Sequence, residues 1–226
     1  MARVTEEHIE ARKAQILDAA WACFSDKGYN QTTMQDIATS AGISAGAIYR
    51  YFAGKEAVLK AINQRSLNMG RAVVQEASNL SSGPLDTLEV IGRTMLSVFY
   101  DPSFESGARV NIEIWPEILR NEELRESVGN ELAFWLTTVT RLLAEAKRSG
   151  QLKDGVEPEA LATVLICARE GMRHFRTISD AFKPEAIVDV TRALVSEEFR
   201  RSAPPSTEIT HGSPTAWPWG SRTHPQ

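Results

Sequence analysis

The sequence of 226 residues predicts an all-α fold. Apolar residues recur at spacings of three and four along most of the chain, which is the period of a helix with one buried face. Serine, threonine, asparagine, proline and glycine stand where these segments begin and stop, and no stretch predicts a credible strand. We expect nine helices in two domains, residues 1–54 and 55–201, followed by a tail over 202–226.

The first predicted helix runs from Glu6 to about Asp26. Its apolar stripe includes Ile16 and Phe24 at helical spacing, and Gly28 is typical of the residue that ends a helix. We expect this helix to brace the segment that follows it.

The segment 33–56 predicts a helix-turn-helix. Thr33 stands three residues before an aspartate, a spacing typical of a helix cap, and Gly42 provides the left-handed residue of a tight turn. Ser44 is a good N-cap for a second helix that reaches about Tyr51. The second helix of such a motif typically enters the major groove of DNA. The alternative is an ordinary helical hairpin in an all-α core.

The second helix of this motif begins with very few side-chain atoms. Residues 44–47 are Ser-Ala-Gly-Ala, so their backbone can come close to another surface. Tyr49 and Tyr51 follow, and Arg50 between them is expected to be solvated. Lys55 stands at the start of the next helix, where its ammonium and the helix N-terminus can both face a phosphate. The pattern therefore favours a nucleic-acid contact.

A longer pattern covers the same stretch. From Thr33 to Glu56 it reads T-x-x-x-I-A-x-x-A-G-I-S-x-G-x-x-Y-x-Y-F-x-x-K-E. This pattern resembles the DNA-binding signature of the tetracycline-repressor (TetR) family of transcriptional regulators, over about a quarter of the chain. The resemblance implies an all-helical body behind three DNA-binding helices. It also implies a homodimeric repressor that binds double-stranded operator DNA, is released by a small-molecule effector, and needs no cofactor.

The resemblance further implies a set of DNA contacts. Thr33, Tyr49 and Lys55 are expected to contact phosphates, and the methyl groups of Ala45 and Ala47 suit thymine methyls better than guanine. For Tyr49 the alternative is a core aromatic that holds the first helix to the third. The full set is Thr33, Gln35, Ser44, Ala45, Gly46, Ala47, Tyr49, Tyr51 and Lys55, of which Gln35, Ala45, Ala47 and Tyr51 are expected nearest the base edges.

Six further helices are expected in the body. Pro84, Pro158 and Pro184 each fit the first turn of a helix, where the missing N–H costs nothing. Asn121 is a typical N-cap, and Pro116 interrupts or kinks the helix before it. The expected ranges are 55–78, 84–100, 103–115, 121–149, 158–178 and 184–201.

The last two of these helices are apolar on more than one side. They have more apolar surface than one body can bury, so the sequence predicts a four-helix bundle with a second copy. Such a homodimer would hold two reading helices about one DNA turn apart, ~34–36 Å. The candidate contacts are Leu161, Val164, Leu165, Ala168, Val188, Thr191, Leu194 and Val195.

Aromatic and acidic residues of the body predict an effector site. Aromatic side chains with convergent acids suit a hydrophobic, aromatic or cationic small molecule. The alternative is that the aromatics are core and that the acids are solvated or matched by Arg109, Arg169 and Arg173. The candidates are Phe99, Phe104, Glu113, Trp115, Trp135, Glu170 and Phe175.

Composition and charge limit the function. The net charge is −4, and residues 1–56 hold six basic and seven acidic side chains. This balance argues against strong non-specific DNA affinity but not against specific binding. No stretch approaches the ~20 consecutive apolar residues of a membrane span, and the first residues lead into charge rather than a signal peptide. We therefore expect a cytoplasmic protein without a membrane partner.

Catalytic and metal chemistry are not indicated. Cys23 and Cys167 lie in apolar helical patterns, which predicts buried free thiols and no metal site. The four histidines are scattered, with no paired carboxylates or nucleophile–base arrangement. A helical small-molecule-binding protein or enzyme without DNA binding is the alternative function. The tail is rich in proline, serine and glycine and is predicted to be disordered, unless Trp217 and Trp219 dock on a surface.

Overall fold

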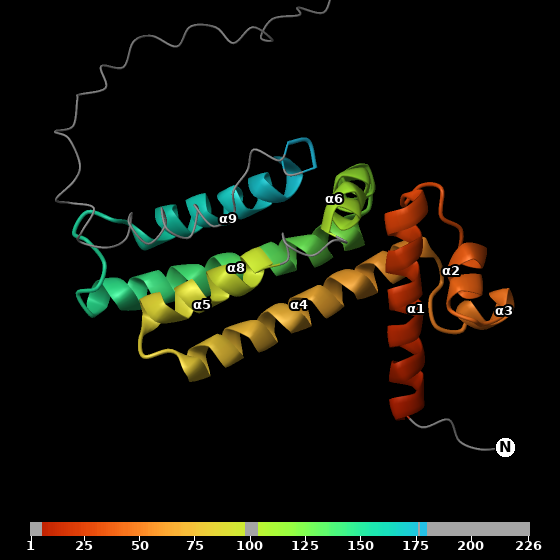
Figure 1. Cartoon of the computed structure of the whole chain (residues 1–226), viewed down its shortest axis with the longest axis horizontal. Helices are drawn as coiled ribbons and strands as arrows, with labels where there is room; N and C mark the ends of the chain where they lie inside the picture. The colour runs from red at the N-terminus through yellow and green to blue at the C-terminus, as the bar shows by residue number, and fades with distance from the viewer. Residues whose placement is uncertain (1–5, 98–103, 176, 180–226) are drawn as a thin grey trace, which may run out of the picture.

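The computed structural model describes residues 6–97, 104–175 and 177–179. Within these residues all regular structure is helical, as predicted (Figure 1). The helices are α1 (Glu6–Lys27), α2 (Met34–Ser40), α3 (Ala45–Ile48), α4 (Lys55–Leu80), α5 (Pro84–Ser97), α6 (Phe104–Glu113), α7 (Trp115–Arg120), α8 (Glu122–Arg148) and α9 (Pro158–Phe175). Outside the described structure lie the predicted helix over 184–201, the tail over 202–226, Phe99, and the side chain of Phe104.

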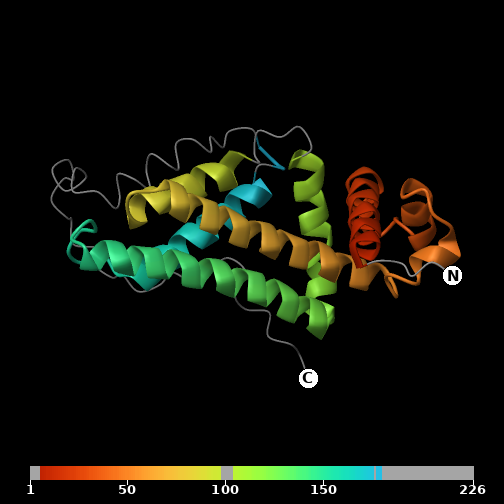
Figure 2. The ribbon, with the colours of Figure 1, turned by 90° about the horizontal axis from the view of Figure 1, so that it is seen from below.

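The helices form a small head and a longer body. Helices α1, α2 and α3 make up the head, and α4 begins beside them and runs along the body (Figure 1). Helix α8 packs against α4, α5 and α9, so these four long helices form most of the body. Helix α6 packs against α1, where the head meets the body (Figure 2). Helices α4 and α6 therefore connect the two parts.

Helix ends follow the capping residues expected from the sequence. Gly42 has a φ of +64°, and the N–H groups of Gly42 and Ile43 donate to the last carbonyls of α2, which is the Schellman arrangement. Asn121 caps α8 by accepting a backbone hydrogen bond at 3.1 Å, and Gly150, with a φ of +73°, follows its end. The predicted prolines open α5 and α9.

Three helix ends differ from the sequence prediction. Helix α3 is one turn long, and the N–H groups of Arg50 and Tyr51 then donate to carbonyls three residues back. The chain turns there because Phe52 is buried in the head core. Pro116 lies in the first turn of a separate helix, α7, where a proline loses no hydrogen bond. Helix α9 ends before Ile178.

The core of the head extends into the body. Its fully buried side chains include Ile16, Phe24, Ile37 and Ile48. The same cluster includes buried residues of the body, from α6 to the start of α8, namely Val110, Ile114, Ile118 and Leu124. Any movement of α6 relative to α1 therefore disturbs core packing. Two further clusters lie within the body, one around Leu143 and one around Trp135.

Both cysteines are free thiols. Cys23 is partly buried against the head core. Cys167 is exposed, so the prediction that it is buried was wrong, because it lies on a side of α9 that no described helix covers. Among the described helices, none is long and apolar enough to cross a membrane. The same residues contain no group of His, Cys, Asp or Glu arranged to hold a metal ion.

Candidate DNA-binding and effector sites

A closed set of hydrogen bonds holds the N-terminus of α2. The Thr33 hydroxyl accepts from the Asp36 N–H at 3.1 Å, and the Asp36 carboxylate accepts from the Thr33 N–H at 2.9 Å. Lys27 pairs with the same carboxylate at 2.6 Å. The hydrogen bonds from Lys27 and Thr33 hold the pKa of Asp36 well below its usual range. The Thr33 hydroxyl also donates to Asp36, so it must exchange that bond to donate to a phosphate.

Helix α3 is positioned by α1 and by its own cap. Gln15 of α1 donates to the carbonyl of Ala41, at the end of α2, at 2.8 Å. Ile48 of α3 is fully buried in the head core. Ser44 caps α3 by accepting from the Ala47 N–H at 3.2 Å. The outer face of α3 is thereby fixed relative to α1 and α2.

The start of α3 is open to close approach. Ser44 and Gly46 are exposed, and Ala45 and Ala47 are half-buried. A Cβ atom built at Gly46 would meet nothing within 4 Å, so internal packing does not require a glycine at this position. The backbone at Gly46 can therefore come closer to another molecule than a larger residue would allow.

The two tyrosines after α3 have different surroundings. Tyr49 is 57% exposed, so the alternative that it is a core aromatic was wrong. Tyr51 is half-buried and packs against the head core. Gln35 of α2 is exposed and donates to the Thr39 hydroxyl at 3.2 Å. Of the two longer side chains expected near base edges, Gln35 is therefore the more accessible.

Lys55 is engaged within the head. Its Nζ donates to the carbonyl of Tyr29 at 2.8 Å and lies 4.6 Å from the centre of the Tyr29 ring. The side chain is half-buried at the first residue of α4. An ammonium has three donor hydrogens, so Lys55 can contact a phosphate while it keeps its bond to Tyr29. Its position relative to DNA then depends on where Tyr29 lies.

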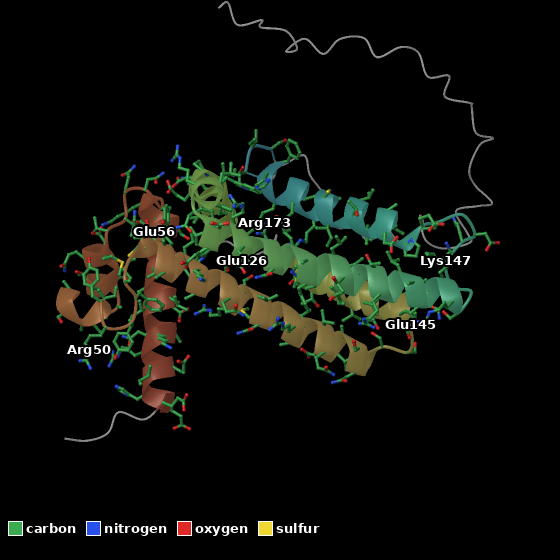
Figure 3. All side chains as sticks on the ribbon, turned by 180° about the vertical axis from the view of Figure 1, so that it is seen from behind. Arg50, Glu56, Glu126, Glu145, Lys147 and Arg173 are labelled. Carbon is green, nitrogen blue, oxygen red and sulfur yellow. The ribbon has the colours of Figure 1, made fainter. Side chains whose placement is uncertain are left out.

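Arg50 is a candidate that the sequence reasoning treated as merely solvated. It is exposed at the outer end of the head, away from the body (Figure 3). No hydrogen bond or ion pair joins its side chain to another residue in the described part of the chain. The sequence holds one signal for this, since the positions three and four residues away on either side are all alanine or glycine. No acid therefore stands at these helical spacings to pair with Arg50.

Of the expected effector residues, the structure describes the side chains of Glu113, Trp115, Trp135, Glu170 and Phe175. Glu113, the last residue of α6, accepts a hydrogen bond from the Tyr29 N–H of the head at 2.9 Å. Trp115 is exposed, and its indole N–H points to Nε2 of His174 at 3.4 Å. Phe175 is exposed as well. Glu113 thus contacts the head rather than the interior of the body.

Trp135 and Glu170 share Arg169 as a partner. Trp135 is 4% exposed, and the Arg169 guanidinium lies 5.4 Å from its ring centre. Glu170 pairs with both Arg169 and Arg173. Burial raises the pKa of Glu170, but the two guanidinium groups lower it by more, so it falls below its usual value. Glu170 is therefore already matched by cations.

Glu131 of α8 lies near the same arginines. Its carboxylate accepts from the Ser66 hydroxyl of α4 at 3.1 Å. Burial raises the pKa of Glu131, and the Ser66 bond and the charges of Arg169 and Arg173 offset this only in part. Nε of Arg169 is buried and has no hydrogen-bond partner within the described structure. Helices α4, α8 and α9 thus bring polar groups together inside the body.

The expected dimer contacts on α9 divide into two sets. Leu161 and Leu165 are partly buried against the body core around Leu143. Val164 is 59% exposed, and Cys167, one turn later, is exposed too. Ala168 is half-buried. The other expected contacts lie outside the described residues, namely Val188, Thr191, Leu194 and Val195.

Comparison with known proteins decides the family. Residues 16–62 match the model of bacterial regulatory proteins of the tetR family, and residues 91–200 match that of the BetI-type transcriptional repressor C-terminal domain. The HTH-type transcriptional regulator YfiR of Bacillus subtilis (strain 168) is 31% identical over 168 residues, which cover 72% of this chain and 77% of the relative. The chain belongs to the TetR family.

Other similar proteins are also transcriptional regulators or share the fold of this TetR-family chain. The HTH-type transcriptional repressor Rv1474c of Mycobacterium tuberculosis (strain ATCC 25618 / H37Rv) is 25% identical over 203 residues, 89% of this chain and 100% of the relative. The solved SmeT–triclosan complex is 25% identical with a TM-score of 0.67, over 83% of this chain and 93% of that one. This TetR-family protein is a ligand-responsive, DNA-binding transcriptional repressor and not an enzyme.

Proposed function

We propose that this repressor binds its operator through the start of α3 and the turn that follows it. The observation that carries the proposal is the surface formed by residues 44–47 together with the exposed Tyr49 and Arg50. It combines a backbone with few side-chain atoms, an exposed tyrosine at position 49, and a cation at position 50 without a partner among the described residues. Base edges can approach the bare backbone there, while Tyr49 and Arg50 reach phosphates.

The repressor acts as a homodimer in the cytoplasm of the bacterial cell, where its operator DNA lies. Two heads must stand about one DNA turn apart, ~34–36 Å, to enter successive major grooves. An effector that binds the body better in another geometry shifts the dimer away from this spacing. The affinities for DNA and effector are then coupled, so each ligand weakens the binding of the other.

The effector is a small hydrophobic or aromatic molecule. Trp135 supplies a buried aromatic surface in the body. Glu170 is not available to bind a cationic effector, because Arg169 and Arg173 already neutralise its carboxylate. The similar protein SmeT was solved in complex with triclosan, which is an uncharged aromatic compound in its phenol form.

Operator binding can be tested by gel shift with DNA from upstream of the protein's own gene. We expect a reversible complex with a Kd in the range of about 10⁻⁸–10⁻¹¹ M, and an affinity that falls as salt rises. Unlabelled upstream DNA should compete and random DNA of equal length should not. Equal competition by the two DNAs, or no complex at low salt, would contradict the proposal.

Effector class is tested on the same complex. Triclosan, a benzyl quaternary ammonium salt and an aromatic carboxylate serve as uncharged, cationic and anionic probes. We expect the uncharged probe to raise the melting temperature of the protein and to release the DNA, because only it enters the body without leaving an unpaired charge. If a charged probe alone produces both effects, the assigned effector class is wrong.

A further inference from the structure

Helix α6 is pressed against the head. Gly107 of α6 faces Trp21 of α1 so closely that a Cβ at this glycine would lie 2.9 Å from the indole ring. Val110 and Ile114 continue the contact as buried members of the head core. The C-terminal end of α6 is therefore held at a defined place beside the loop between α1 and α2.

At that place Glu113 binds the corner where α1 ends. Its Oε2 accepts from the Tyr29 N–H at 2.9 Å across 84 residues of sequence. Gly28, the residue before, has a φ of +83°, and a Cβ there would lie 2.6 Å from the same Oε2 atom. The left-handed backbone favours glycine at position 28, and the absence of a side chain there leaves room for the Glu113 carboxylate. The corner is thus shaped to receive a carboxylate.

Tyr29 also faces Lys55, the cation that the family resemblance assigns to a phosphate contact. Its carbonyl accepts from Nζ of Lys55 at 2.8 Å, and its ring lies 4.6 Å from the same Nζ. The Tyr29 side chain is buried and packs against Phe24. A single residue, bonded by Glu113 on one side and Lys55 on the other, therefore joins α6 to the first residue of α4.

We propose that Glu113 is a positioning residue for operator binding, which holds Lys55 in reach of a phosphate by fixing Tyr29. This inference rests on the proposed DNA surface. Glu113 touches no DNA itself. When its bond to Tyr29 is lost, the corner shifts, and the Lys55 ammonium moves with the carbonyl that binds it. Any change in the body that moves α6 away from α1 breaks the same bond. Glu113 therefore also links the body to the head through a hydrogen bond.

The test is a double-mutant cycle between Glu113 and Lys55, read by operator affinity across a series of salt concentrations. We expect Glu113→Ala to lower affinity about tenfold and to reduce the slope of log affinity against log salt by about 0.9, the value for one lost phosphate contact. Lys55→Ala should do the same. In the Lys55→Ala background, Glu113→Ala should change affinity little further, whereas a purely structural role would add its full cost in both backgrounds.

Three further variants keep the test decisive. Glu113→Gln retains an acceptor oxygen and should restore most of the affinity. Glu113→Asp keeps the charge but draws the carboxylate back from the Tyr29 N–H, so it should reproduce the loss even if the alanine variant does not fold. Glu126→Ala removes an exposed acid from α8 and should have no effect. Wild-type affinity and salt slope in the Glu113→Asp variant would overturn the inference, whereas failure of the wild-type protein to bind DNA would instead overturn the proposed surface.

Discussion

Three cations of the head differ in what they already bind. Lys27 pairs with Asp36, and Lys55 donates to the Tyr29 carbonyl. Arg50 is exposed and has no partner among the described residues. A phosphate contact by Arg50 costs no existing bond, whereas one by Lys55 shares an ammonium that is already engaged. This division explains how a head with more acids than bases can still bind DNA at one face.

We expect Arg50→Ala to weaken binding to operator and to random DNA by similar factors. Because the guanidinium neutralises one phosphate, the slope of log affinity against log salt should fall by about 0.9. Fluorescence anisotropy titrations at several salt concentrations measure both quantities. Arg148→Ala removes the same charge from the exposed last residue of α8 and should leave both unchanged. Its neighbour in sequence, Lys147, lies far from the head (Figure 3). A normal slope in Arg50→Ala would place the phosphate contacts elsewhere.

Single residues were predictable where their partners are near in sequence. The roles of Thr33, Gly42 and Asn121 as caps followed from spacing, because each bonds groups within a few residues. The sequence assigned Glu113 to the effector site. It could not reveal the bond to Tyr29, because that partner is 84 residues away. The Glu131 pair with Ser66 spans 65 residues and was missed for the same reason. Helical periodicity carries no information about such contacts.

At the scale of elements, the sequence predicted the long helices in order, but neither the separate helix α7 nor the length of α3. Periodicity identifies long amphipathic helices such as α4 and α8, and the start of α8 is also marked by its Asn121 cap. The length of α3 is decided by the need to return Phe52 to the core, which is a tertiary constraint. Helix α3 is thus a single turn that depends on its neighbours and its Ser44 cap, because one turn has little stability alone.

We expect Gly46→Ala to stabilise the protein and yet weaken operator binding. Alanine should raise the free energy of unfolding by roughly 0.5–1 kcal/mol, since it favours the helix and meets nothing within 4 Å. The added methyl stands where DNA must approach, so operator affinity should fall. Thermal unfolding and anisotropy measure the two effects. Undiminished affinity would show that α3 does not approach the DNA at this point.

Gly42→Ala is the matched comparison for Gly46→Ala. Gly42 also has open space around its Cβ position, but its φ of +64° strains any other residue. Alanine there should lower the free energy of unfolding by about 1 kcal/mol. The two variants together separate the cost of a left-handed backbone from the cost of a methyl group at the DNA surface.

At the scale of the whole molecule, head and body form one connected structure. Buried residues of α6 and α7 belong to the same core as α1 and α2, so the orientation of the head depends on the body. The sequence could not predict this shared core, because Val110 and Ile16 are distant in the chain. One surface of the body stays uncovered by the described helices, namely the side of α9 that carries Val164 and Cys167.

The exposed side of α9 belongs to the predicted dimer interface. A substitution there tests the interface without disturbing the body core. Leu165, an obvious target from the sequence, is partly buried against the body core, so a charge there would also unfold the body. Val164 is 59% exposed. A glutamate at position 164 costs little in the monomer, but it would be buried without a partner between two copies.

We therefore expect Val164→Glu to be folded, monomeric in light scattering, and unable to bind the operator, because one head alone cannot engage two successive grooves. Met69→Glu places the same charge at a side chain of similar exposure, 63%, on α4. It should stay dimeric and bind normally. If Val164→Glu is dimeric with normal operator affinity, α9 does not meet a second copy through this side. If both variants become monomeric, the added charge rather than its position is responsible, and the interface must be sought elsewhere.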